Sequence, residues 1–256
     1  QAADGHAEHK GAWPADSYYG EMNGSWKDTS AKITTSSRPQ NINIPGDGKF
    51  DLSTLNTLVE LQVGRVDLHS MTKAPDASVS EEELLRRYLN KAHDFRHKQG
   101  AYAAIPRRSL IRDGFGNYGN TEPFAASGWA TAHNSVGGEI DQAGSDEWFS
   151  EKYAGGRDYL WGYGCGPGTY ESAATVGSSA DFGSKASRVV FTSIFRSYHG
   201  DWDSDNNLMR SVIAGNAEGT SLGLACIWSG RPYWFTHPLG MGETLGYMTR
   251  LSMNAV

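Results

Sequence analysis

Cysteine is scarce in this sequence, and several other features that identify a protein class are missing. The two cysteines, Cys165 and Cys226, are too few for a disulfide scaffold, and their separation of 61 positions matches no zinc-ligand spacing. No apolar run approaches the roughly 18 residues of a membrane-spanning helix. Lys and Arg number 23 against 29 Asp and Glu, with no basic run, which argues against a nucleic-acid partner.

Glycine and aromatic residues are abundant. The 256 residues include 31 glycines, 8 tryptophans and 12 tyrosines, and glycine averages only about 7% of a typical chain. This composition predicts long ordered loops held by aromatic side chains. The chain begins with Gln1 and shows no signal peptide, so we expect a processed piece of a longer precursor.

The residue composition of the sequence changes near residue 58. Residues 1–57 are rich in turn-forming residues and predict a loop-rich N-terminal segment packed on the same domain. Residues 58–256 contain short apolar runs separated by glycine-rich turns, which predict strands over 58–66, 109–113, 159–164, 189–195 and 221–229. Because most of these runs are apolar on both faces, we expect an α/β fold with a mostly parallel central sheet flanked by helices.

One predicted helix carries clear local signals. Ser80 and Glu83 have the spacing of a capping box, and apolar residues recur at helical spacing from Leu84 to Phe95, before Gly100. Two further helices are expected over residues 206–214 and 242–254, with Asp205 as the N-cap of the first.

Ligands of parallel sheets bind beyond the carboxyl ends of the strands, so reactive or ligand-binding residues are expected in the strand-end loops. Cys165 lies between glycines after the strand over 159–164, where we expect an accessible thiol. His199 follows the strand over 189–195 and is the nearest candidate base. The alternative is that both residues are structural. Cys226 lies within an apolar run and is expected in the core.

Other residues have the chemistry of ligands. Asp201, Asp203 and Asp205 alternate as in the start of a calcium loop, although the remainder of that motif is absent, and Asp47 and Asp51 form a second acidic pair. Calcium binding and ordinary turn or capping roles both remain open for these acids. The aromatic loop that contains Arg231, Tyr233 and Trp234 predicts either the wall of a substrate pocket or packing over the sheet edge.

Several phrases resemble the gingipain-type cysteine peptidases, which have a caspase-like α/β fold. They are PADSYYGEMNGSW from residue 14, PGDGKFD from residue 45, LVELQVGRVD from residue 58, GYGCGPG from residue 162 and FTSIFRSYHGDW from residue 191. They occur in the family's order and cover about residues 14–251. In this alignment Cys165 replaces the family's catalytic histidine, and Ser197 stands at the position of its catalytic cysteine.

The resemblance implies an extracellular or cell-surface protein that acts on a protein or peptide and binds calcium for stability. The two substituted positions favour a catalytically degenerate domain with a binding or structural role. An alternative hypothesis is an active cysteine peptidase that uses Cys165 as nucleophile and His199 as base. A third pairs His199 with Cys226.

Overall fold

The computed structural model describes residues 16–31, 34–35, 42–51, 57–75, 77–116, 125–200, 204–228 and 234–255. The helical elements are α1 (Ser17–Gly20), α2 (Glu81–His97), η2 (Gly100–Tyr102), α3 (Ala126–Thr131), η3 (Ala132–Val136), α4 (Ser179–Ser184), α5 (Leu208–Ala214), α6 (His237–Gly240) and α7 (Leu245–Asn254). The strands are β1 (Arg108–Asp113), β2 (Glu139–Gln142), β3 (Tyr159–Cys165), β4 (Gly168–Thr169), β5 (Ser172–Ala173), β6 (Gly177–Ser178), β7 (Val189–Phe195) and β8 (Ala225–Trp228). Among these described residues, no helix is long and apolar enough to cross a membrane.

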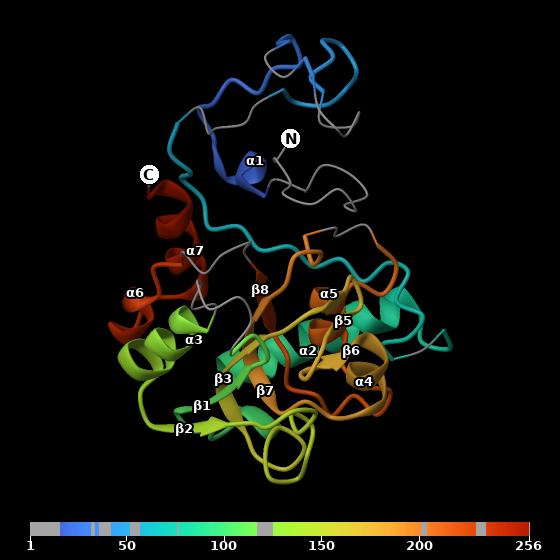
Figure 1. The fold of residues 1–256 in the computed structure, drawn as a ribbon, viewed down its shortest axis with the longest axis vertical. Helices are drawn as coiled ribbons and strands as arrows, with labels where there is room; N and C mark the ends of the chain where they lie inside the picture. Colours follow the sequence, from blue (N-terminus) through green and yellow to red (C-terminus); the bar gives the residue numbers. More distant parts are fainter. Residues whose placement is uncertain are drawn as a thin grey trace.

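Five parallel strands form the central sheet in the order β2-β1-β3-β7-β8 (Figure 1). The predicted α/β class with a parallel sheet is therefore confirmed. β2 was not expected from the sequence. β8 is shorter than the predicted strand over 221–229, although the amide of Leu222 still donates to the carbonyl of Ser187 and that of Leu224 to the carbonyl of Val190 in β7.

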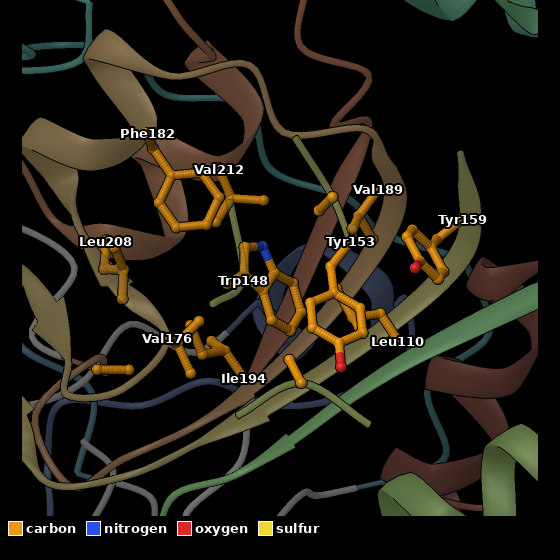
Figure 2. Close-up of a cluster of buried hydrophobic side chains, with 13 residues drawn as sticks. Leu110, Trp148, Tyr153, Tyr159, Val176, Phe182, Val189, Ile194, Leu208 and Val212 are labelled. Atoms are coloured by element: carbon orange, nitrogen blue, oxygen red, sulfur yellow. The ribbon is translucent and has the colours of Figure 1, made fainter. Parts of the chain in front are cut away.

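One face of the sheet carries the largest buried cluster, with Trp148 at its centre (Figure 2). Helices α4 and α5 cover this face through Phe182, Leu208 and Val212. Two glycines of β3 make the close packing possible. A Cβ at Gly162 would lie 2.9 Å from Cη2 of Trp148, and a Cβ at Gly164 would lie 2.9 Å from Cγ2 of Val176.

The opposite face packs against α3 and η3. Ile111, Tyr163 and Cys165 form a buried cluster with residues of these two helical elements. Gly128 lies directly against the ring of Tyr163, because a Cβ at this position would come within 2.3 Å of the ring. With helices on both faces, the parallel sheet is shielded as its apolar strands require.

Helix α2 begins where its sequence predicts. The side chain of Ser80 accepts a hydrogen bond from the amide of Glu83 at 3.2 Å. The helix ends at His97, before Gly100, because Lys98 adopts a left-handed conformation with φ of 53°. Leu84 is buried between α2 and α5, in a cluster that includes Ile213.

Several of the sequence predictions need correction. Residues 58–66 form no strand: the amide and carbonyl of Val59 pair with the side chain of Asn254 on α7, and two following amides share the carbonyl of Gly20. The predicted helix over 206–214 begins at Leu208, because Asn206 has φ of 52° and the side chain of Asn207, not that of Asp205, caps the helix.

The last helix also begins later than the predicted start at residue 242. It starts at Leu245, since the side chain of Thr244 accepts a hydrogen bond from the amide of Tyr247. In the described part of residues 16–51, α1 is the regular element, and the remaining backbone consists of turns and extended segments at the top of Figure 1.

Candidate functional site at the carboxyl edge of the sheet

Three strand ends meet side by side at the carboxyl edge of the sheet. Asp113 of β1 is in register with Cys165 of β3, which is in register with Phe195 of β7. The chain after β3 folds into a small antiparallel sheet of β4, β5 and β6, and the chain after β7 continues into the segment that contains His199. The candidate residues of the two loops are thus brought to one edge.

Cys165 is the last residue of β3 and is fully buried, with 0% of its surface exposed. Its thiol donates a hydrogen bond to Oδ1 of Asp113 at 3.3 Å. Burial, together with the negative charge and hydrogen bond of Asp113, raises the pKa of the thiol to about 12. The expectation of an accessible loop thiol is therefore wrong, because the strand extends through Cys165 and the aromatic cluster encloses it.

His199 is also fully buried, and its ring faces the small sheet. Nε2 lies 3.4 Å from the carbonyl oxygen of Ser172 on β5, and Nδ1 has no hydrogen-bond partner among the described residues. Burial is the main reason that the pKa of His199 falls to about 3. The structure does not join Cys165 and His199 by a hydrogen bond, since each side chain is directed to a different group.

The two other candidate nucleophiles lie in different environments. Ser197 is half-buried in the loop after β7. Cys226 lies in β8 and is half-buried, so it packs against the edges of the two buried clusters beside α5 and is not itself a fully buried core residue. Burial raises the pKa of the Cys226 thiol. Both cysteines are free thiols.

The acidic candidates are held by other protein groups. Asp47 accepts hydrogen bonds from the side chain and amide of Lys49, which lower the pKa of its carboxyl. Oδ2 of Asp51 accepts from the amide of Ser30, and Asp205 is exposed. Within the described ranges, no group of three or more His, Cys, Asp and Glu side chains is placed to hold a metal ion. Asp201 and Asp203 lie outside the described residues.

The candidate pocket wall is described only in part, because Arg231 and Tyr233 lie outside the described residues. Trp234 is half-buried. The next residue, Phe235, donates its amide to the side chain of Ser252 on α7 at 2.9 Å. Trp234 is therefore placed beside the C-terminal helix.

The sequence analysis did not identify Arg196, a charged side chain at this edge whose guanidinium has two nitrogens without a hydrogen-bond acceptor among the described residues. It directly follows β7, and its guanidinium lies over the ring of Tyr198, 4.6 Å from the ring centroid. The ring of Tyr170, from the turn between β4 and β5, lies 5.5 Å from that of Tyr198. Nε and Nη1 of Arg196 are buried and have no acceptor in the described part of the chain. A basic residue between a predicted strand and an aromatic loop residue was the available signal.

No protein-family model, curated protein or solved structure matches this chain. The functional argument therefore depends on the arrangement of its own residues. The five-stranded parallel sheet flanked by helices is consistent with the caspase-like fold that the sequence resemblance implies.

Proposed function

We propose that this chain is a caspase-like domain of a secreted protein that binds a protein or peptide partner and does not itself cleave peptide bonds. One observation carries the proposal: the thiol of Cys165 is buried and donates to the carboxylate of Asp113. A cysteine peptidase needs the opposite environment, in which a nearby cation or imidazole stabilises the thiolate.

The surroundings of Cys165 act against ionisation in two ways. Burial removes the water that would solvate a thiolate, and the negative charge of Asp113 would repel it. His199 cannot compensate, because its ring is directed to the carbonyl of Ser172 and its burial favours the neutral form. The thiol of Cys165 is therefore held in its neutral form, and His199 is not hydrogen-bonded to it to take its proton.

Ser197, at the family's nucleophile position, lacks an activating base as well. A serine hydroxyl attacks a carbonyl only when a neighbouring group removes its proton. The histidine of the same loop, His199, uses Nε2 toward Ser172, and no described residue bonds its Nδ1. A partner-binding role at the carboxyl edge is therefore the function that this arrangement supports best.

Thiol labelling of the native protein tests the proposal. At pH 8, a pKa of about 12 leaves about one Cys165 thiol in ten thousand ionised, against roughly a quarter for an ordinary cysteine of pKa near 8.5. We expect iodoacetamide to leave Cys165 unmodified in the native protein under conditions that label the urea-unfolded chain completely. Mass spectrometry of the two peptides that contain Cys165 and Cys226 reads the result.

A peptidase assay of the wild type and of Cys165→Ala tests the same proposal by a second measurement. We expect a mixed fluorogenic peptide library to remain uncleaved by the wild-type protein and by Cys165→Ala alike. Rapid native labelling of Cys165, together with peptide cleavage that Cys165→Ala and His199→Gln abolish, would overturn the proposal in favour of an active cysteine peptidase.

A further inference from the structure

We propose that His93 and His97, on the exposed side of the last turns of α2, form a binding site for a divalent transition-metal ion such as Zn²⁺. The site uses none of the residues at the carboxyl edge of the sheet, and it does not depend on the proposed function. Two imidazoles bind the ion, and water fills its remaining coordination positions.

The spacing of the two histidines places them on one side of the helix. Residues four positions apart are neighbours on a helix surface, one turn above the other. The ring centroids of His93 and His97 are 4.3 Å apart, with 34° between the ring planes. A metal ion with nitrogen ligands at about 2 Å holds two such nitrogens roughly 3 Å apart. A small rotation about the side-chain torsions therefore lets each ring present one nitrogen to the same ion.

Both rings are accessible to an ion in solution. The side chain of His93 is 61% exposed, and His97 is also exposed. α2 packs on the fold through its other side, where Leu84 is buried and Tyr88 and Phe95 are partly buried. Because neither imidazole belongs to the core, binding of an ion requires no rearrangement of the fold, and either histidine can be replaced without loss of buried packing.

The carboxylate next to His93 orients its ring for metal binding. Oδ1 of Asp94 lies 3.5 Å from Nδ1 of His93, so Nε2 is the nitrogen that remains for the ion. In metal sites, a carboxylate on the second ring nitrogen fixes the orientation of a ligand histidine and increases its basicity.

The end of the helix also affects a bound cation. His97 is the last residue of the 17-residue α2, and the negative end of a helix dipole attracts positive charge. The neighbouring side chains of Arg96 and Lys98 act in the opposite direction. The proposal therefore depends on the two coordination bonds and not on attraction by charge.

The type of ligand determines the class of metal. Imidazole nitrogen suits Zn²⁺, Ni²⁺ and Cu²⁺, whereas Mg²⁺ and Ca²⁺ prefer oxygen ligands. In the described part of the chain, His93 and His97 are the one pair of histidine rings in contact. The rings of His69, His133 and His237 each lie beside a different kind of side chain. The pair on α2 can therefore chelate an ion through two imidazoles.

Titration of the metal-free protein with ZnCl₂ at pH 7.5 tests the inference. Calorimetry measures the affinity, and NMR of the ¹⁵N-labelled imidazoles identifies the ligands. We expect saturable binding in which the ring signals of His93 and His97 change together while that of His69 does not. MgCl₂ is the matched salt control, and it should leave the signals of both ligands unchanged because Mg²⁺ prefers oxygen.

Single substitutions show whether the two rings act as one chelate. The second imidazole meets an ion that the first already holds, so its binding has the advantage of a high effective concentration. Loss of either ring should therefore remove most of the affinity. We expect His93→Ala and His97→Ala each to weaken Zn²⁺ binding about tenfold or more, and His69→Ala to leave it unchanged.

A variant with altered spacing separates chelation from the mere presence of two imidazoles. The double substitution Asn90→His/His93→Ala keeps two histidines at exposed positions of α2, but about 10.5 Å apart along the helix axis. It should bind Zn²⁺ as weakly as His93→Ala. Saturating Zn²⁺ should also raise the Tm of the wild type more than that of this variant, because the chelate forms only on the folded helix.

Three results would overturn the inference. The first is Zn²⁺ binding that both single substitutions leave unchanged, which would place the ion elsewhere in the chain. The second is binding to the variant of altered spacing as tight as binding to the wild type. The third is an equal change of the two ring signals with MgCl₂.

Discussion

Acidification should destabilise this protein through His199. The imidazole is 0% exposed, and its pKa falls from 6.5 to about 3, mainly because of burial. The positive charge of Arg196 acts in the same direction, while the carbonyl of Ser172 opposes the change. Below pH 6.5 the unfolded chain binds a proton at this position that the folded protein excludes. The contribution to stability is therefore present above pH 6.5 and is lost as the pH falls toward 3.

The size of the effect follows from the two pKa values. One pKa unit corresponds to about 1.4 kcal/mol. At pH 4.5 the unfolded chain is two units below its own pKa at His199, and the folded protein is still almost fully neutral there. The free energy of unfolding should therefore fall by about 3 kcal/mol between neutral pH and pH 4.5 through this residue alone.

Urea unfolding at pH 7 and pH 4.5 measures this term. Many carboxyl groups also titrate in this range, so the quantity of interest is the difference between the wild type and His199→Gln. The wild type should lose about 3 kcal/mol more than the variant on acidification. Leu84→Ala is the control, because it removes buried surface without a titratable group and should lower stability equally at both pH values. Parallel pH profiles for the wild type and His199→Gln would refute the enclosed neutral imidazole.

Two further predictions concern α2. Leu84→Ala, at a side chain only 1% exposed, should cost about 3 kcal/mol and lower Tm by roughly 6–12 °C, while Leu85→Ala, at 41% exposure, should change stability by less than about 0.5 kcal/mol in calorimetry; equal effects would contradict the packing of α2. Lys91 donates to the carbonyls of Ile213 and Gly223, and burial lowers its pKa from 10.5 to about 7. Stability should therefore rise between pH 7 and 9.5 in the wild type relative to Lys91→Met, as read from urea midpoints, and a constant difference between the two would contradict this.

The sequence predicts best the elements that depend on neighbouring residues or on burial of both faces of a strand. The side chain of Ser80 caps α2 by accepting a hydrogen bond from the amide three residues later, so four consecutive residues determine where the helix starts. The central residues of β1, β3 and β7 are buried on both faces, and the consecutive apolar residues within these strands reflect this. No distant partner has to be known to identify either feature.

Predictions failed where the decisive partner is distant in the chain. Residues 58–66 have the composition of a strand, but the amide of Val59 donates to the side chain of Asn254 and its carbonyl accepts from that side chain, 195 positions later. The glycines on either side of Cys165 suggested a loop that begins directly after the predicted strand over 159–164. In the structure, Gly164 is a strand residue that leaves room for Val176, and the strand continues through Cys165. A glycine needed for close packing and one needed for a turn look alike in a sequence.

The same limit applies to the site, where burial is the property that the sequence did not reveal. Burial acts differently on the three groups gathered there. Cys165 and His199 respond to enclosure by becoming neutral, which removes both the thiolate and the imidazolium of a catalytic pair. A guanidinium cannot follow them, because its pKa starts above 12 and it stays charged. An enclosed edge of this composition therefore lacks an ionised nucleophile, while the guanidinium groups of Arg112 and Arg196 remain charged.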